Sequence, residues 1–346
     1  MTVTSEEVRV TDDPAVRASV FAHAARTLDV RIAGYTPNFL GLHNRKWTVH
    51  TDAGDLFLKC YHPKRYSLID AARYEKIERS LKAQHDLHNN GVPCPAVKAA
   101  ADGKPVHLTP EGHFYVAMQC AAGRTAKAGT VDPLRMYRLG QATGLMHRQL
   151  DRSLPRAGTG AEASRGWWPS LAAMQAEWRS NMEAAQRLPA LDARLLAAME
   201  KQGRILSGID LSVFDGLKPG WAHWDYWVDN ILFDEDQVTG LIDFDTVTFG
   251  YPEIDVARVL LSAALDTEAG ELRTYAAEAF LDGYREHRIF PYNRLTLAFQ
   301  LLWCREAHWW LQGAVQFKDA PPKRFSQELI WLTEQWETLE AQFADW

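Results

Sequence analysis

The stretch 223–245 constrains the fold of this chain more than any other. It opens with the pattern H-x-D-x4-N and closes with Ile-Asp-Phe-Asp, and two short apolar runs surround four polar residues in between. This arrangement is typical of a β-hairpin. Asn230 and Asp243 lie at equal distances from its centre, so we expect them to face one another, with Cα atoms roughly 5 Å apart. An amide oxygen and a carboxylate would then converge on one cation.

These side chains are the ones that phosphoryl transfer needs. Magnesium takes a few protein oxygens and completes its shell with phosphates and water, so we interpret Asn230 and Asp243 as ligands of Mg²⁺. Asp225 lies in the turn before the hairpin, where a kinase has the aspartate that accepts the proton of the attacked hydroxyl. We interpret Asp225 as the catalytic base. Asp229 and the acids 234–236 are interpreted as a solvated turn with no chemical role.

Length and composition narrow the class of protein. The 346 residues allow one large or two medium domains, and a net charge of -6 argues against a nucleic-acid partner or an anionic membrane surface. The four cysteines form no C-x-x-C pair, so a zinc site or a disulfide framework is not expected. With no signal-peptide pattern and no apolar run of membrane-spanning length, we expect a cytoplasmic protein.

The first hundred residues read as a helix followed by strands. Asp-Asp-Pro at 12–14 predicts a helix to about Leu28, and strands are predicted near 30–35, 47–51 and 56–61. The loop 37–46 could fold over nucleotide phosphates, with Asn44 as a donor, or be an ordinary hairpin loop. No G-x-x-x-x-G-K-[ST] pattern occurs anywhere, which excludes a P-loop.

Lys59 lies inside the apolar strand near 56–61. Burying an ammonium group without a partner costs several kcal/mol, so an anion is expected beside it. Phosphate oxygens and a helix glutamate would meet that need. The stretch 67–90 reads as a helix, and Glu78 at the edge of its apolar stripe is the predicted partner of Lys59. The alternatives are an edge-strand lysine and exposed helix acids.

The middle of the chain predicts a hinge and then a helical region. The apolar strand Phe114–Cys120 runs into Ala-Ala-Gly, and backbone groups from Met118 to Cys120 are predicted to hydrogen-bond an adenine. From Asp132 onward helices are expected. Three polar residues of this region are interpreted as structural rather than catalytic. They are His147, as a satisfied buried histidine, Asp255, as a brace for the catalytic loop, and Glu306, as a partner of a nearby arginine. The alternative for Glu306 is an acid exposed in a cleft, where it would meet a substrate amine.

Taken together, these motifs resemble the aminoglycoside phosphotransferase and choline kinase family. The resemblance rests on Leu58-Lys59-x-Tyr61, the Gly-Val-Pro-x-Pro turn at 91–95, and the catalytic and metal motifs, with Asp255 after them. The segment from Asn44 to Arg124 is similar to the bacterial stress-response kinases of this group. The resemblance implies that Lys59 binds the phosphates of the nucleotide. It does not identify the acceptor of the phosphoryl group. Members often carry glycine after the catalytic-loop histidine, where this chain has Trp224.

The resemblance implies an α+β, two-lobed, protein-kinase-like fold. We expect a β-rich N-terminal lobe over 1–120 and a helical C-terminal lobe over 121–346 that carries the catalytic and metal-binding loops. The expected function is transfer of the γ-phosphate of ATP, with Mg²⁺, to a hydroxyl of a sugar, amino sugar, aminoglycoside-type antibiotic or amino alcohol. The short interval from Asp243 to Asp255 and the lack of A-P-E disfavour a peptide substrate. A stress-response Ser/Thr protein kinase and a nucleotide-binding pseudokinase remain as alternatives.

Overall fold

The computed structural model describes residues 12–39, 44–155, 169–319 and 321–346. The chain forms two compact units. The first consists of the residues up to Gly123 together with Thr239–Thr246, and the second consists of Arg124–Val238 and Val247–Trp346. The expected α+β class, with a β-rich part followed by a helical part, is confirmed.

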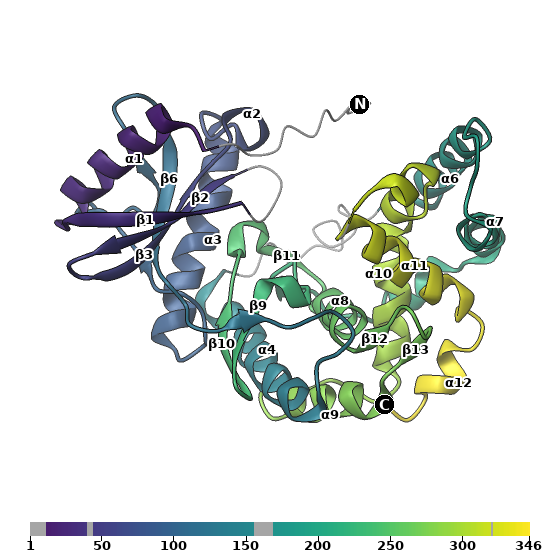
Figure 1. Cartoon of the computed structure of the whole chain (residues 1–346). Coiled ribbons are helices and arrows are strands. Elements are labelled where there is room, and N and C mark those ends of the chain that lie inside the picture. Colours follow the sequence, from purple (N-terminus) through teal and green to yellow (C-terminus); the bar gives the residue numbers. More distant parts are fainter. Residues whose placement is uncertain (1–11, 40–43, 156–168, 320) are drawn as a thin grey trace. The chain divides into compact units, whose positions relative to one another are not determined.

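The first unit is built on an antiparallel sheet in the order β1-β2-β3-β6-β4, with β5 paired to β6 (Figure 1). Its helices are α1 (Pro14–Thr27), α2 (Pro63–Tyr66), α3 (Ala71–Asn89) and the short 3-10 turn η3 (Phe244–Thr246). Its strands are β1 (Ile32–Asn38), β2 (Arg45–Thr51), β3 (Gly54–Cys60), β4 (Val97–Lys98), β5 (His107–Leu108) and β6 (Phe114–Gln119).

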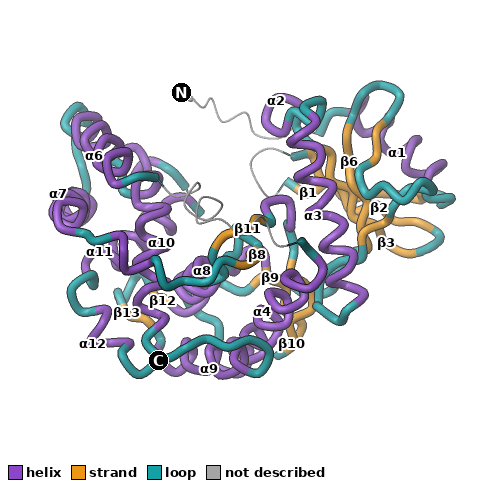
Figure 2. The backbone as a smooth tube through the Cα atoms, turned by 180° about the vertical axis from the view of Figure 1, so that it is seen from behind, coloured by secondary structure: helices purple, strands orange, loops and turns teal. Residues whose placement is uncertain are grey.

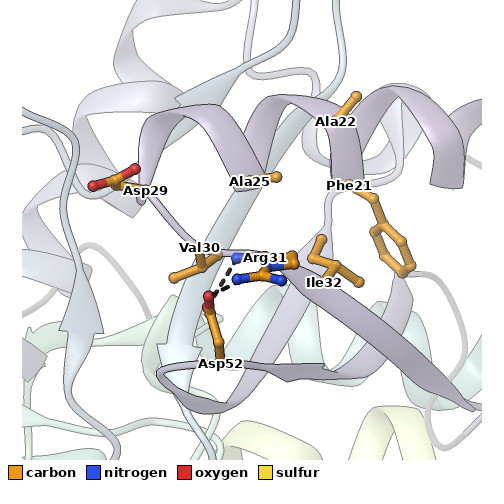
Figure 3. Close-up of a pocket in the computed structure, with 8 residues that line it drawn as sticks. All are labelled: Phe21, Ala22, Ala25, Asp29, Val30, Arg31, Ile32 and Asp52. Atoms are coloured by element: carbon orange, nitrogen blue, oxygen red, sulfur yellow. Dashed lines mark hydrogen bonds and ion pairs between the residues drawn. The ribbon is translucent and has the colours of Figure 1, made fainter.

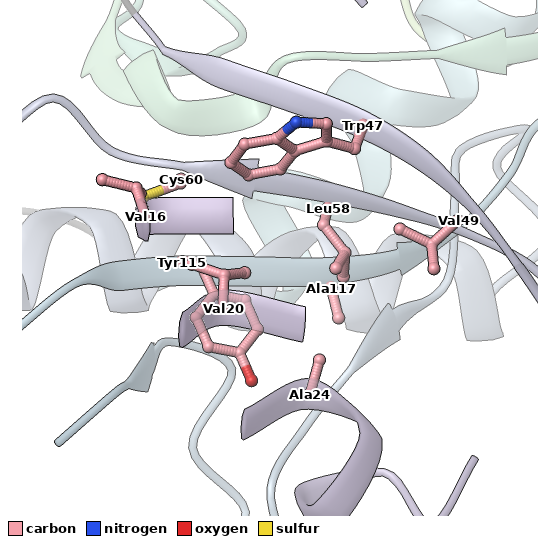
Figure 4. Packing of buried hydrophobic residues seen from close by; sticks show 9 residues of the cluster. All are labelled: Val16, Val20, Ala24, Trp47, Val49, Leu58, Cys60, Tyr115 and Ala117. Carbon is pink, nitrogen blue, oxygen red and sulfur yellow. The ribbon is translucent and has the colours of Figure 1, made fainter. Parts of the chain in front are cut away.

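Alternation along the strands gives this sheet two apolar faces, each covered by one helix. The face toward α1 carries side chains that pack with that helix, as Figure 4 shows. The residues of this cluster are Val16, Val20 and Ala24 of α1 with Trp47, Val49, Leu58, Cys60, Tyr115 and Ala117 of the sheet. The opposite face packs on α3 through Ile77 and Leu81, which meet Tyr61, Val116 and Met118. Lys59, between Leu58 and Cys60, therefore points to the α3 face, as the period of two predicts.

Predicted boundaries in this unit agree with the structure to within a few residues. Asp13 caps α1 by accepting hydrogen bonds from the backbone N–H groups of Ala15 and Val16, and Pro14 is the first helical residue. Residues 40–43 of the predicted phosphate loop lie outside the described part of the chain. The segment 239–246, which we expected in the C-terminal lobe, groups with the first unit because its acids contact Lys59.

The second unit is mostly helical. Its helices are α4 (Pro133–Ser153), α6 (Leu171–Ala185), α7 (Ala193–Gly208), α8 (Glu253–Ala264), α9 (Thr274–Arg285), α10 (Arg294–Trp310), α11 (Pro322–Glu334) and α12 (Leu339–Phe343). Its 3-10 turns are η1 (Leu211–Phe214), η2 (Val228–Asn230) and η4 (Gly313–Phe317). Its strands are β7 (Arg124–Thr125), β8 (Gly220–Ala222), β9 (Ile231–Asp234), β11 (Thr248–Gly250), β12 (Leu265–Asp266) and β13 (Glu271–Leu272), and β10 (Gln237–Leu241) crosses the unit boundary.

Two features of this unit matter for the site. β8 and β11 pair in antiparallel register, with Ala222 opposite Thr248 and Gly220 opposite Gly250. This pairing places the turn after β8 beside the chain that leads into β11, and hydrogen bonds from its backbone N–H groups to Asp255 tie the turn to α8. The predicted hairpin is present, because β9 is the central strand of a three-stranded sheet in the order β10-β9-β7. Helices α6 and α7 lie side by side in both views of the backbone (Figures 1 and 2).

Helices α4 and α9 approach so closely that only glycine fits at their crossing. A Cβ atom on Gly140 would lie 2.0 Å from the backbone oxygen of Phe280, and one on Gly283 would lie 2.1 Å from that of Tyr137. We predict that Gly140→Ala lowers the free energy of unfolding by about 1–3 kcal/mol, because one helix must shift. Urea denaturation measures this, with Gly208→Ala, which has open space around its Cβ position, as the control. Equal stability of the two variants would contradict the prediction.

Among the described residues, no helix is long and apolar enough to span a membrane.

Candidate active site

Lys59 is the centre of a buried ionic cluster in the first unit. Its side chain is 3% exposed, and its Nζ donates hydrogen bonds to Asp243 Oδ1 at 3.0 Å and to Asp245 Oδ2 at 2.8 Å. Tyr61, two residues along the strand, donates its hydroxyl to Asp245 Oδ1 at 3.1 Å. Burial acts to lower the pKa of Lys59, but the two carboxylates outweigh it and place this pKa well above its usual value. The lysine is therefore charged, and the expected anionic partner is present.

That partner is not the predicted one. Glu78 does not pair with Lys59 in the structure, because its carboxylate binds Lys82, one turn further along α3, at 3.1 Å. A Glu and a Lys four residues apart face each other on a helix, and the lysine side chain is 56% exposed. The ion pair that we expected between strand and helix is thus formed between the strand and the turn after β10. A nucleotide-binding role for Glu78 stays a prediction.

Asp225 and Asn230 form the corresponding pair in the second unit. Asn230 Nδ2 donates to the backbone oxygen of Asp225 at 2.8 Å and to its Oδ2 at 3.3 Å. Both side chains are partly exposed. Because the amide nitrogen is turned toward Asp225, the amide oxygen is the Asn230 atom left to bind a cation. Asn230 and Asp243 belong to different units, and their predicted approach to a common metal ion stays a prediction.

The turn that carries Asp225 is held by Asp255 at the start of α8. Asp255 is 1% exposed, and its carboxylate accepts hydrogen bonds from the backbone N–H of His223 at 2.6 Å and of Trp224 at 2.9 Å. His147 contacts the same carboxylate through Nε2 at 3.0 Å and Tyr284 through Nδ1 at 2.9 Å. Burial lowers the pKa of His147, against the opposing effect of Asp255. The structural roles predicted for both residues agree with these contacts.

Trp224 has a backbone conformation that favours glycine. Its φ is +74°, in the left-handed region where a side chain carries a steric cost. The hydrogen bond to Asp255 holds this conformation on the backbone side. On the side-chain side, the Arg305 guanidinium lies 4.3 Å from the centre of the Trp224 ring, a cation–π contact that glycine could not make. These contacts explain how tryptophan occupies a position where the resemblance led us to expect glycine.

An ionic network, largely buried except at Asp229, lies at the other end of the H-x-D-x4-N turn. Asp229 accepts hydrogen bonds from both terminal nitrogens of Arg324 in α11, while its side chain stays half exposed, as expected of an acid in a solvated turn. Arg324 also contacts Glu328 at 3.2 Å, and Glu328 contacts Arg258 of α8 at 3.3 Å. Burial raises the pKa of Glu328 to about 7, while Arg258 and Arg324 oppose that shift. The sequence carried no signal for this network because its members come from three separate segments.

Glu306 belongs to the same network. It is 3% exposed, binds Arg258, and accepts hydrogen bonds from Arg305 at 2.7 Å and from the Trp310 indole at 3.0 Å. The prediction that an arginine neutralises this acid agrees with the structure. Among the described residues, no group of three or more His, Cys, Asp or Glu side chains is placed to hold a metal ion by itself. Any cation here would depend on few protein ligands and on the phosphates of a nucleotide.

The remaining predicted nucleotide contacts are occupied by protein partners. Asn44 is buried, and its Oδ1 accepts a hydrogen bond from the backbone N–H of His62 at 3.1 Å, so it braces the start of α2. Met118 is a buried core residue of β6 between β3 and β4. The backbone N–H of Cys120 donates to the oxygen of Asp55 at 3.3 Å. Adenine binding by Met118 to Cys120 stays a prediction, and it has to use other backbone groups than this one.

An open surface hollow lies elsewhere on the first unit. It is lined by Phe21, Ala22, Ala25, Asp29, Val30, Arg31, Ile32 and Asp52. Figure 3 shows that Asp52 reaches the backbone and side chain of Arg31 in its wall, at 2.9 Å and 3.7 Å. The hollow contains none of the residues predicted to bind nucleotide or metal.

The arrangement of a buried strand lysine, a following acid pair, and a braced H-x-D-x4-N turn defines a phosphotransferase of the kinase type. Comparisons with known proteins agree. The profile of the phosphotransferase enzyme family matches residues 35–290, and the chain belongs to this family. The expected class, a phosphotransferase that acts on a hydroxyl group of a small molecule, is thereby confirmed.

Three relatives illustrate the range of the similarity. The homoserine kinase of Polaromonas naphthalenivorans is 26% identical over 283 residues, which covers 80% of each chain. The aminoglycoside phosphotransferase from Alicyclobacillus acidocaldarius superposes with a TM-score of 0.63 at 16% identity, covering 97% of this chain and 98% of that one. An amicoumacin kinase in complex with AMP-PNP and Ca²⁺ gives a TM-score of 0.57 at 15% identity, covering 96% and 97%. At such identities the structural matches establish the fold alone.

Proposed function

We propose that this protein transfers the γ-phosphate of ATP to a hydroxyl group of a small molecule, with Mg²⁺ as the cation. The observation that carries the proposal is the Asp225–Asn230 pair, held by Asp255 through two backbone N–H groups. A carboxylate in this position accepts the proton of an attacking hydroxyl. The amicoumacin kinase with AMP-PNP and Ca²⁺ supports the use of a nucleotide and a divalent cation.

Each unit contributes a defined part. In the first unit, Lys59 would bind phosphate oxygens and Asp243 would bind the cation. In the second, Asp225 would orient and deprotonate the acceptor, and Asn230 would offer its amide oxygen to the cation. When bound, Mg²⁺ would neutralise charge on the transferred phosphoryl group. The residues fit this ion, because one amide oxygen and one carboxylate leave most of an octahedral shell to phosphates and water.

For the acceptor, we infer a small hydroxylated amino acid or amino alcohol. Curated relatives that match most of the chain are homoserine kinases. Arg305 supplies a physical reason in this chain, because its guanidinium lies against Trp224, next to the proposed base. Burial lowers the pKa of Arg305 to about 10, and the carboxylates of Asp255 and Asp225 oppose the shift. A guanidinium held near the base would bind a substrate carboxylate in a bidentate manner.

The experiment is a coupled assay of ADP release with a panel of acceptors. The panel contains homoserine, the same amino alcohol without its carboxylate, an aminoglycoside and a simple sugar. We expect the highest kcat/KM with homoserine or a close analogue, and we expect Arg305→Lys to reduce it more for the acceptor with a carboxylate. A preference for the aminoglycoside would contradict the acceptor assignment. Phosphorylation of a generic protein by labelled ATP would favour a protein kinase, and nucleotide binding without any turnover would favour a pseudokinase.

Asp243→Ala is expected to damage binding of the metal–nucleotide complex. The change removes the predicted metal carboxylate, so affinity for Mg²⁺–nucleotide should fall at least about tenfold, while affinity for metal-free nucleotide should fall less. Calorimetry with and without Mg²⁺ measures both values. Asp55→Ala is the control, since this acid of the same unit is half exposed and pairs with His50. An unchanged dependence on Mg²⁺ would refute the assignment of Asp243.

A further inference from the structure

Asp245 is a buried acid to which the motif alone assigns no role. Its side chain is 3% exposed, and both carboxylate oxygens accept hydrogen bonds from buried donors, Oδ2 from Lys59 and Oδ1 from Tyr61. Such an acid cannot leave Lys59 without also losing the buried Tyr61 hydroxyl, at a cost of about 1–3 kcal/mol for an unsatisfied group, and without leaving the lysine to Asp243 as its other carboxylate partner. Its contact with Lys59 is therefore a lasting one.

Asp243 binds the same ammonium but has different surroundings. Its side chain is 34% exposed, and its Oδ1 lies 3.0 Å from Lys59 Nζ. A carboxylate that water reaches can exchange one cation for another at much lower cost than a buried one. The ion pair of Lys59 with Asp243 therefore costs less free energy to break than its ion pair with Asp245.

The short turn between the two acids explains why both reach one lysine. Phe244 is fully buried, and it anchors η3, which contacts α3. Asp243 has φ of +66°, a left-handed conformation that costs energy for a residue with a side chain. With Phe244 anchored between them, the flanking carboxylates converge on Lys59. Backbone strain of this kind is common where a site requires a particular geometry.

Charge decides what the cluster can bind. One ammonium and two carboxylates carry a net charge of about -1, which repels phosphate oxygens. If a divalent cation takes Asp243, the same groups with the cation carry about +1, and phosphate is attracted. Lys59 then needs a second anion to stay charged and in place, and a buried carboxylate that remains bound supplies it.

We propose that Asp245 is the positioning residue that holds Lys59 throughout the reaction, and that Asp243 is its exchangeable partner, which moves to the metal ion when nucleotide binds. Asp245 thereby does what the sequence led us to expect of Glu78. The inference rests on the proposed function, because it assigns phosphate to Lys59 and metal to Asp243. Asp245 itself would touch neither substrate nor metal, and it would act by positioning Lys59.

The test is the Mg²⁺ dependence of AMP-PNP binding, measured by calorimetry on the full chain. In Asp245→Asn, Asp243 is the remaining charged partner of Lys59 and competes with the metal. We expect affinity for Mg²⁺–AMP-PNP to fall at least about tenfold and the midpoint of the Mg²⁺ titration to rise. In turnover, KM for ATP should rise more than kcat falls, with KM for the acceptor little changed. Asp55→Asn, an equivalent change at an exposed site on β3, should stay within twofold of the wild type.

Two results would overturn the proposal. One is Asp245→Asn binding Mg²⁺–AMP-PNP like the wild type. The other is a loss in Glu78→Gln as large as that in Asp245→Asn, which would restore the helix glutamate as the partner of Lys59.

A stability cycle keeps the inference testable if Asp245→Asn folds poorly. Lys59→Met leaves Asp245 buried without its cation, so Lys59→Met/Asp245→Asn should unfold at a higher temperature than Lys59→Met alone. A further loss of stability in the double variant would show that Asp245 serves another purpose. If the wild type bound no nucleotide, the proposed function would fail, and this cycle would still decide whether Asp245 exists to hold Lys59.

Discussion

Asp225→Ala is expected to abolish most turnover while leaving nucleotide affinity within about threefold of the wild type. A general base contributes about 10²–10⁴-fold to the rate, and the change removes only the side chain that is proposed to face the acceptor. The turn itself should persist, because Asn230 also donates to the backbone oxygen of Asp225, and Asp255 holds the preceding residues. A steady-state assay of ADP release gives kcat, and calorimetry gives the affinity.

The matched control for this prediction is Asp234→Ala. Asp234 is an exposed acid at the end of β9, in the same hairpin region, and its loss should change kcat by less than twofold. Equal activity of Asp225→Ala and the wild type would refute the role of Asp225 as the base. A large loss of nucleotide affinity in Asp225→Ala would show that this residue serves ground-state binding instead.

Asp255→Ala is expected to have the largest effect on stability. The change removes an acceptor shared by the buried backbone N–H of His223, the partly buried backbone N–H of Trp224 and the buried side chain of His147. Stranding buried partners in this way costs about 3–5 kcal/mol, which corresponds to a fall in Tm on the order of 10 °C. Thermal unfolding followed by circular dichroism measures this shift.

Activity at a temperature where the Asp255→Ala variant is folded provides a second measurement. We expect kcat to fall together with Tm, because the positive φ of Trp224 loses the hydrogen bond that holds it. Asp282→Ala is the control, since this exposed acid of α9 makes only a surface contact with Arg285, and its loss should cost less than about 0.5 kcal/mol. A Tm like that of the wild type would rule out Asp255 as the brace.

Several residues were assigned correctly from the sequence because their context is local. Lys59 stands in an alternating apolar strand, so its side and its need for an anion follow from the period of two. Asp255 stands shortly after the acid motif, in the first turn of a helix, where a carboxylate is well placed to accept backbone N–H groups. His147 and Glu306 interrupt apolar helix faces, and a buried polar group in such a place must find a partner.

Other assignments failed because a contact partner cannot be chosen from spacing alone. Glu78 and Asp245 are both acids within plausible reach of Lys59, and the local helix geometry that gives Glu78 to Lys82 competes with the long-range pairing. Asp229 is the exposed acid that we expected, but its contact with Arg324, 95 residues away, could not be read from the sequence. The nucleotide contact of Asn44 stays a prediction, and nothing in the sequence indicated that its Oδ1 accepts a hydrogen bond from the backbone of His62.

The motif spacing, the strand and helix periods, and the position of the turns were enough to predict the phosphotransferase class and the α+β fold, and they are the basis on which residues are proposed for chemistry. These patterns are formed by residues only a few positions apart, so they can be recognised in the sequence itself. Which acid holds Lys59, why tryptophan is accepted at position 224, and how Asp229 is anchored came only with the folded molecule. Each of these is settled by competition among charges and rings that are distant in sequence, and burial determines which pair forms.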